Sequence, residues 1–555
     1  MSEPVHERAR SAPAAGVDAG SHAAEGRRTA TRVRNERVLR PIDFVLFFIL
    51  SVASLAAIVN FFVTWSINGG FAENPALFLI VTSLLALVLI NQQGRWYLLL
   101  PMRRPRAMAP EPGLRVAVVT TYVAGAEPRD MLEHSLEALV DLTYPHDTWL
   151  LDESDDPDVK ALCDRLGVRH FSRLGIEAYQ TDSGSFKRAS KHGNYNAWLD
   201  AKGYHRYDVL AAFDPDHVPH PSFLHGTIGY LSDTRIGYVQ AAQAYYNQGA
   251  SFIAQGAAEE TYAYYSAVQM ASYGLGYPIL VGCHNVHRMR ALREIGGFAA
   301  HDADDLLLTL HYREGGWEGV YVPRILARGL TPVSWRGYLT QQRRWARSVL
   351  DIKVRRREPH SGHLPPGSRI MSFLHGINFM HRSIVGTVAV LILVWMLMLG
   401  ETHIFRVELL VPTLLLFGTL QVAELYRQRF YIDWPNERGL HWRSALLEYA
   451  KWPWLLAALF DVILKRAPAY ALTWKTRHEH RFEPFILYHA GLALLTGVAW
   501  IIGTLASGEV HPVLRLCAAL VIATSTALVA TELAGFPAPY DRRLWRPIQN
   551  PDRTP

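Results

Sequence analysis

The chain has 555 residues, of which 50% are hydrophobic and 19% are charged, and its formal net charge is +6. These values exclude an intrinsically disordered chain, a collagen-like repeat and a small disulfide-stapled domain. The three cysteines, Cys163, Cys283 and Cys517, lie far apart in the sequence, so we expect them to be reduced. Several apolar runs are long enough to cross a bilayer, which predicts an integral membrane protein with a large water-soluble insert.

Basic residues flank the first two apolar runs. Residues 1–40 are predicted to form a disordered basic tail, and residues 41–101 a transmembrane hairpin. Arg103, Arg104 and Arg106 follow the hairpin at once. By the positive-inside rule, we expect both the tail and the segment after residue 101 to lie in the cytosol.

Residues 110–335 contain no run long enough to span a bilayer. Apolar strands are predicted at 115–123 and 207–213, and a helix is predicted at 131–142. Strands that alternate with helices predict a cytosolic α/β domain with a largely parallel sheet. In such sheets ligands bind at the carboxyl ends of the strands.

Amphipathic segments and further spans follow the α/β domain. Residues 336–370 have a basic face and an aromatic-aliphatic face, which is typical of a helix on a membrane surface. Transmembrane pairs are predicted over 371–426 and 483–536, before a cytosolic tail at 537–555. The segment 440–482 is predicted to hold an interfacial helix, because its charged residues are costly at bilayer depth. The α/β domain is thus expected to be inserted in a bundle of about six spans, with both termini cytosolic.

The motif FDPDHVPH places two aspartates, Asp214 and Asp216, directly after a buried strand. Two carboxylates at a strand end suit Mg²⁺ or Mn²⁺ and, through the metal, a diphosphate. Asp152 follows another predicted strand and strengthens this interpretation. A solvated turn is the alternative for the D-x-D alone. His217 and His220 lie in the same loop, but loop histidines more often support ligands than act as ligands, so we do not include them.

Three acids precede the predicted helix that runs to about Arg313. Acidic residues at a helix start are commonly caps, which suits Asp302 or Asp304. Asp305 is the better candidate to point one carboxylate into a cleft as a general base.

The segment TQQRRWARS contains Gln341, Arg344 and Trp345 within about one helical turn. An arginine can stabilise a leaving diphosphate, and a tryptophan offers a flat surface to a sugar ring. A basic helix anchored by tryptophan on anionic lipid is the alternative. Lys191 and Asn194, in SKHGNYNAW, have the residue types of a nucleotide-contacting loop.

The order D, D-x-D, x-D-D, Q-x-x-R-W between transmembrane helices resembles the processive family-2 glycosyltransferases, which include cellulose and hyaluronan synthases. The resemblance implies a GT-A-like catalytic domain. It also implies a donor site to which these residues contribute: Tyr122 (base stacking), Asp152, Lys191, Asn194, Asp214, Asp216 and Arg344, with Asp214 and Asp216 also holding the metal.

By the same resemblance, Asp305 is the catalytic base, and the acceptor is bound by Gln341, Trp345 and Asp304. The family's T-E-D motif reads Ala303, Asp304, Asp305 here. The sequence YALTWK is similar to a gating loop that covers the loaded site, with matching residues Tyr470, Thr473 and Lys475.

The resemblance implies an inner- or plasma-membrane enzyme that uses Mg²⁺ or Mn²⁺ and a UDP-linked sugar to extend a β-linked polysaccharide. The growing polymer and membrane lipids are the expected partners, an export partner stays open, and no nucleic acid is expected. One alternative is a non-processive enzyme that transfers a single sugar to a lipid. Another is a transporter or scaffold whose cytosolic domain only binds nucleotide. The sugar and its linkage stay open.

Overall fold

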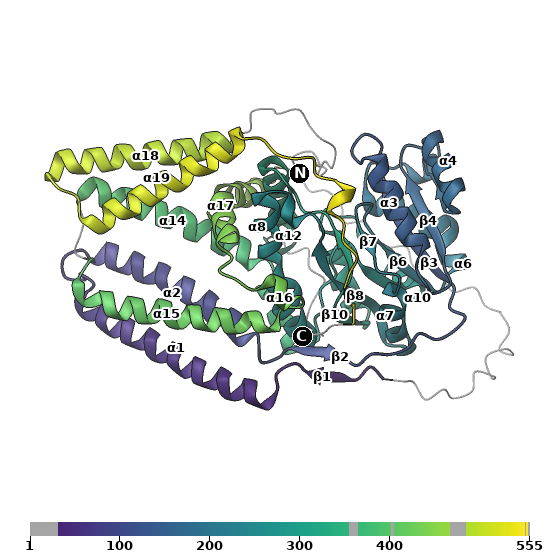
Figure 1. Ribbon diagram of the computed structural model, residues 1–555, viewed down its shortest axis with the longest axis horizontal. Coiled ribbons are helices and arrows are strands. Elements are labelled where there is room, and N and C mark those ends of the chain that lie inside the picture. Colours follow the sequence, from purple (N-terminus) through teal and green to yellow (C-terminus); the bar gives the residue numbers. More distant parts are fainter. Residues whose placement is uncertain (1–31, 355–364, 401–403, 467–483, 550, 553–555) are drawn as a thin grey trace, which may run out of the picture.

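The computed structural model describes residues 32–354, 365–400, 404–466, 484–549 and 551–552 (Figure 1). An α/β domain lies at one end of the molecule and a group of long helices at the other. The sheet of the domain has eight strands in the order β5-β4-β3-β6-β9-β8-β10-β7. The strands are β3 (Val116–Tyr122), β4 (Asp147–Asp152), β5 (Arg169–Phe171), β6 (Val209–Ala212), β7 (Val218–Pro219), β8 (Ile236–Tyr245), β9 (Asn285–Arg288) and β10 (Glu318–Gly329).

The sheet is mixed, but six of its eight strands run in one direction, which agrees with the largely parallel sheet expected from the sequence. Strands β5, β4, β3 and β6 are mutually parallel, and β8 is parallel to β10. Strand β9 runs antiparallel to both β6 and β8, and β7 is antiparallel to β10. Because β9 is inserted out of sequence order, its direction depends on long-range pairing, which hydrophobic periodicity does not reveal.

Both faces of the sheet are covered, because alternate residues of a strand point to opposite faces. Val116 and Val118 of β3 pack in the core that includes α3 and α4. Ala117 and Val119 pack in the second core, with α5, α10 and α11. The helices of the domain are α3 (Arg129–Val140), α4 (Pro157–Leu166), α5 (Lys191–Trp198), α6 (Tyr204–Arg206), α7 (Phe223–Thr227), α8 (Phe252–Ala263), α9 (Gln269–Gly274), α10 (Met289–Glu294) and α11 (Asp304–Glu314).

Six helices in the described part of the chain are long and apolar enough to cross a membrane, which agrees with the expected number. They form two groups in Figure 1, α1 with α2 and α15, and α14 with α18 and α19, and α2 contacts α14. Their bounds are α1 (Pro41–Asn68), α2 (Pro75–Tyr97), α13 (Pro366–Leu374) continuing as α14 (Ile377–Leu399), α15 (Leu410–Arg427), α18 (Pro484–Ser507) and α19 (Pro512–Leu533).

The residues just before α1 are ordered, which corrects the disorder expected up to residue 40. Strand β1 (Asn35–Arg37) pairs with β2 (Arg103–Pro105), which follows α2. The Tyr273 hydroxyl donates a hydrogen bond of 2.6 Å to Asn35 Oδ1, and Val33 N donates one of 3.0 Å to Asp233 Oδ2. The partners lie some 200 residues away in the chain, so the local composition of the tail could not predict this strand.

Helices α12 (Trp335–Val354) and α17 (Trp442–Ile463) connect the domain to the spans, while the short α16 (Trp434–Glu437) follows α15. The aromatic-aliphatic face of α12 was expected to lie on lipid. In the structure, Trp335, Tyr338 and Leu339 on that face are buried, and α12 packs against α17. Amphipathicity predicts that an apolar face is covered, but it does not say by what.

A buried ionic network joins these helices to the domain. Lys451 of α17 donates a hydrogen bond of 2.9 Å to Glu260 of α8, and its Nζ lies 3.1 Å from Glu448 Oε1. The hydroxyl of Tyr338 on α12 also donates to Glu260, at 2.7 Å. Arg382 of α14 lies 2.8 Å from Glu448. The charges are therefore mutually compensated across four helices.

Removal of the central cation should destabilise this junction. We expect Lys451→Met to lower the free energy of unfolding by about 3–5 kcal/mol, because it leaves the largely buried Glu260 carboxylate without its cation. Arg515→Met, which breaks an exposed pair with Glu509, is the matched control and should cost at most about 1 kcal/mol. Thermal unfolding of the full chain in detergent would measure both, and equal losses would contradict the assignment.

Candidate functional site

The acidic residues of the D-x-D motif follow strand β6, near the middle of the sheet. Asp214, Asp216 and His217 each offer one ligand atom, and these atoms lie within 4.8 Å of one another. Asp216 is buried, and its Oδ2 accepts a hydrogen bond of 3.1 Å from the backbone of Leu330, at the end of β10. The donor set, two carboxylates and one imidazole, fits Mg²⁺ or Mn²⁺.

His217 was not predicted to be a metal ligand, although the neighbouring Asp214 and Asp216 were. Its Nδ1 lies 3.3 Å from Asp216 Oδ1, and its Nε2 lies 3.5 Å from Cys283 Sγ. His217 directly follows the D-x-D motif in the sequence, but only the fold shows that Cys283 and His284 lie against its ring.

Lys191, at the start of α5, links the D-x-D motif to the strand region before β9. Its Nζ donates hydrogen bonds to Asp214 Oδ1 at 2.5 Å and to the carbonyl oxygen of Gly282 at 2.6 Å. Burial lowers the pKa of Lys191, but the combined effects of Asp214, Tyr195 and Asp304 outweigh burial and raise the pKa well above its ordinary value. The ammonium therefore stays charged, in a position from which it can also attract an anionic ligand.

Asp304 and Asp305 form the first turn of α11, and both are half-buried. Burial raises the pKa of Asp305 to about 7, and the negative charge of Asp304 adds to this effect. Burial raises the pKa of Asp304 in the same direction. Lys191 and Asp214 also act electrostatically on Asp305, so the fold brings these four predicted residues together. A carboxylate with a pKa near neutrality is suited to general-base chemistry.

Asp152 lies at the end of β4, two strands from β6 in the sheet, or about 10 Å at ordinary strand spacing. Its oxygens accept hydrogen bonds from Ser154 N and Oγ at 2.9 and 2.6 Å and from Asp156 N at 2.7 Å. These bonds, together with His170 at 3.2 Å, outweigh burial and lower its pKa. Asp152 thus shapes the loop after β4 and stays ionised.

Tyr122 and Asn194 are both buried. Tyr122 is only 2% exposed and belongs to the core on the α3 face. Its role in base stacking stays a prediction. Asn194 is buried, its Nδ2 donates 3.3 Å to the carbonyl oxygen of Leu151, and its Oδ1 has no hydrogen-bond partner.

The Q-x-x-R-W residues lie on α12, which is fixed next to the acidic loop. Arg347 of α12 pairs with Asp302 at 2.5 Å, and Asp351 lies 3.2 Å from His301. Gln341 and Arg344 are half-buried, whereas Trp345 is 39% exposed. The capping alternative for Asp302 is replaced by this ion pair. Tyr470, Thr473 and Lys475 lie outside the described residues.

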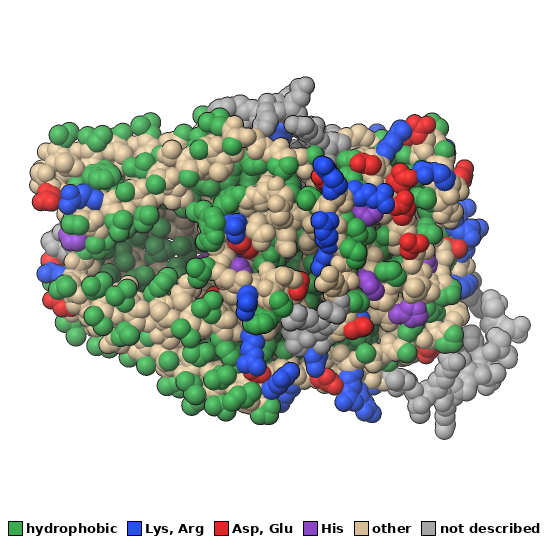
Figure 2. All heavy atoms as spheres, in the orientation of Figure 1, with side chains coloured by type: hydrophobic (Ala, Val, Ile, Leu, Met, Phe, Trp, Pro, Cys, Tyr) green, Lys and Arg blue, Asp and Glu red, His purple; other side chains and the backbone are tan. Residues whose placement is uncertain are grey.

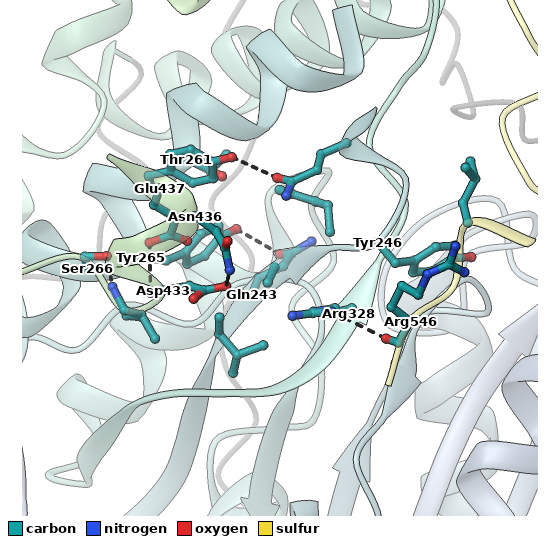
Figure 3. Close-up of a pocket in the computed structure, with 17 residues that line it drawn as sticks. Gln243, Tyr246, Thr261, Tyr265, Ser266, Arg328, Asp433, Asn436, Glu437 and Arg546 are labelled. Atoms are coloured by element: carbon teal, nitrogen blue, oxygen red, sulfur yellow. Dashed lines mark hydrogen bonds between the residues drawn. The ribbon is translucent and has the colours of Figure 1, made fainter. Parts of the chain in front are cut away.

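A cavity of about 210 Å³ lies next to the D-x-D loop (Figure 3). It is lined by β8, β10, the α8 region, residues 432–437 and the C-terminal segment. The Tyr265 hydroxyl donates a hydrogen bond of 2.8 Å to Gln243 Oε1, and Gln243 Nε2 lies 3.3 Å from His217 Nε2. One glutamine therefore connects the cavity wall to the metal-ligand group.

The carboxylates should dominate metal affinity. We expect Asp216→Asn to weaken Mn²⁺ binding about tenfold or more, because asparagine keeps the shape but loses the charge. Electron paramagnetic resonance of free Mn²⁺ would measure the affinity. Asp164→Asn, at an exposed carboxylate of the same domain, is the control. Unchanged Mn²⁺ affinity in Asp216→Asn would contradict the site.

Comparison with known proteins is consistent with this geometry. A sequence family described as "Glycosyltransferase like family 2" matches residues 112–348. A curated relative, "Glucomannan 4-beta-mannosyltransferase 7" of Arabidopsis thaliana, is 26% identical over 233 residues. That match covers 39% of this chain and 40% of the relative, so the chain spans about two fifths of the relative's length.

Two solved structures are similar at lower identity. The mannosyltransferase PcManGT of Pyrobaculum calidifontis, in complex with GDP-Man and Mn²⁺, is 16% identical, with a TM-score of 0.48 over 70% of this chain and 99% of that one. The glucosyl-3-phosphoglycerate synthase of Mycobacterium tuberculosis, with Mn²⁺ and UDP, is 18% identical, with a TM-score of 0.27 over 38% of this chain and 70% of that one. The segment that matches this family, residues 112–348, folds as a GT-A-like α/β domain with a mixed sheet, and in the described part of the chain it is joined to six candidate transmembrane helices.

Proposed function

We propose that the chain is a membrane-embedded, processive, inverting glycosyltransferase that builds a β-linked polysaccharide from a nucleotide sugar and passes it across the membrane. The observation that carries the proposal is the half-buried Asp305, whose pKa is raised to about 7, within electrostatic reach of Lys191 and Asp214. The β-mannosyltransferase name of the plant relative supports transfer of a hexose in the β configuration.

In this mechanism Asp305 accepts the proton of an acceptor hydroxyl as that oxygen forms a bond to C1 of the donor sugar. The bond from C1 to the diphosphate oxygen breaks, and the nucleoside diphosphate leaves with the electron pair. A single displacement inverts the configuration at C1. Lys191 and Arg344 would bind the diphosphate, and Trp345 would stack against the acceptor sugar. A divalent cation held by Asp214 and Asp216 would supply further neutralisation of the leaving group.

The charge distribution supports a cytosolic catalytic domain in a plasma or inner membrane. Figure 2 shows hydrophobic side chains over the long helices and charged side chains over the domain. Lys and Arg side chains gather at the junction of the two parts in this view. Basic residues at such a junction favour the cytosolic side, where they meet anionic lipid.

A second candidate, transfer of one sugar to a lipid, is favoured by a different observation. Figure 2 shows a hollow between the α14–α18 side and the α2–α15 side of the helices, and its visible walls are mainly hydrophobic. Such a hollow accommodates acyl or isoprenoid chains, whereas a polysaccharide needs polar partners for its hydroxyls.

Sizing the product separates the two candidates. The full chain in nanodiscs would receive Mn²⁺ and radiolabelled UDP-glucose, UDP-N-acetylglucosamine or GDP-mannose, with and without a polyprenyl phosphate. We expect a long, hydrolase-sensitive polymer from one donor without the added lipid, and no product from Asp305→Asn. A single glycolipid that requires the polyprenyl phosphate would establish the second candidate, and full activity of Asp305→Asn would reject the assigned base.

The pH dependence should report the same base. Because the pKa of Asp305 is raised to about 7, its basic form is lost as the pH falls through that value. The titratable groups that act around it are Asp304, Asp214, Lys191 and Tyr264. We expect kcat/KM to fall about tenfold per pH unit on the acid side. Asp304→Asn should move this limb to lower pH, because it removes a neighbouring negative charge.

The control for this profile is Asp302→Asn. Asp302 lies in the same loop but pairs with Arg347, so the acid limb should keep its midpoint. If the acid limb of the kcat/KM profile keeps its midpoint in Asp304→Asn, Asp305 is not the titrating base.

A further inference from the structure

We propose that His217, Cys283 and His284 form a second metal site that binds a borderline-soft divalent ion such as Zn²⁺, next to the carboxylate site of Asp214 and Asp216, with which it shares the ring of His217. The three side chains are buried, and one ligand atom from each lies within 4.8 Å of the other two. The inference does not depend on the proposed function, because metal binding can be measured without a donor or an acceptor.

The distances are close to those of a metal-bound group. Zn²⁺ binds nitrogen at about 2.0–2.1 Å and sulfur at about 2.3 Å, which places neighbouring tetrahedral ligand atoms about 3.4–3.6 Å apart. Cys283 Sγ and His217 Nε2 are 3.5 Å apart. The rings of His217 and His284 meet edge to face with centroids 4.5 Å apart, so small side-chain rotations bring the third ligand into range.

His284 is the residue that most needs a ligand. It is fully buried at 0% exposure, and its Nε2 has no hydrogen-bond partner. Its backbone φ is +56°, in the left-handed region that a non-glycine residue adopts at a conformational cost. A buried imidazole nitrogen without a partner is unusual in a folded protein, and coordination to a cation satisfies it.

The residues around His217 and Cys283 favour a metal-bound arrangement. Its Nδ1 faces Asp216 Oδ1 at 3.3 Å, the carboxylate–histidine arrangement that commonly orients metal-binding imidazoles. A Cβ at Gly329 would lie 2.1 Å from His217 Nε2, so glycine there makes room for the ring. Gln243 Oε1 lies 3.6 Å from Cys283 Sγ and can supply a fourth ligand.

The two sets of ligands prefer different kinds of metal ion. A thiolate with two imidazoles selects Zn²⁺ over Mg²⁺, whereas two carboxylates select the harder ions. Gln243, which lies 3.6 Å from Cys283 Sγ, also lines the cavity in Figure 3. An ion at Cys283 would hold His217, and through it the Asp216 carboxylate, in one orientation.

The test measures metal stoichiometry and a spectrum on the full chain in nanodiscs, without nucleotide or sugar. Treatment with Zn²⁺ in excess Mg²⁺, followed by desalting, should leave about one Zn²⁺ per chain by mass spectrometry. Cys283→Ser and His284→Gln should each weaken Zn²⁺ binding about tenfold or more. Cys163→Ser, at another buried thiol, is the matched control and should bind Zn²⁺ like the wild type.

Co²⁺ binding gives a spectroscopic test that can be made on the wild-type chain, without a destabilising substitution. Wild type and Cys163→Ser should each develop a thiolate-to-Co²⁺ charge-transfer band in the near ultraviolet, and Cys283→Ser should not. Absence of stoichiometric Zn²⁺ and of this band in the wild type would overturn the site. Zn²⁺ retained equally by Cys283→Ser and His284→Gln would do the same. A chain that binds Zn²⁺ but transfers no sugar would reject the proposed function and keep this inference.

Discussion

The ion pair between Lys191 and Asp214 is the interaction on which the candidate site depends. Asp214, Asp304 and Asp305 are brought into one region by a strand end and a helix start, and their mutual repulsion opposes that arrangement. The half-buried ammonium, 2.5 Å from Asp214 Oδ1, offsets part of this repulsion. The repulsion that remains adds to the effect of burial and raises the pKa of Asp305 to about 7. The same charges thus hold the site together and tune its base.

The second constraint is that helix α12 contacts both the acidic loop of the site and the helices that lead to the candidate spans. Helix α12 contributes Arg347 to the pair with Asp302 near the acids, and its Tyr338 contributes to the buried network around Lys451. Since buried, fully paired charges are costly to separate, α12 keeps a fixed position between the domain and α17. Gln341 and Arg344 lie between these two attachment points along α12, so their placement is set from both ends.

Local patterns in the sequence predicted the features that depend on local physics. Six apolar runs in the described residues became candidate spans, Asp214 follows a buried strand, and Asp305 lies in the first turn of a helix. Features that depend on distant partners were missed. Strand β9 is antiparallel because it pairs between β6 and β8, and Asn35 is ordered by Tyr273. Neither contact leaves a trace in neighbouring residues.

Contacts between distant side chains illustrate the same limit. Tyr122 was expected from its motif position to stack on a base, and its strand packs it in the core, so that role stays a prediction. Cys283 and His284 gave no metal-ligand spacing, because their partner His217 lies 66 residues earlier than Cys283. A metal group assembled from distant segments is recognisable only after folding, whereas the D-x-D pair is recognisable by itself.

The nature of the acceptor depends on what lines the space between the helices. Polar side chains occur there at the ends of α2 and α15, where Gln92, Gln93 and Arg95 face a small pocket with Glu424 and Arg427. The hollow visible farther along the helices is mainly hydrophobic. Sugar hydroxyls can be satisfied at the first region but not by the walls of the second, because desolvating a hydroxyl without a partner is costly. A sugar polymer would therefore be stabilised at the first region, whereas the second region suits an acyl or isoprenoid chain.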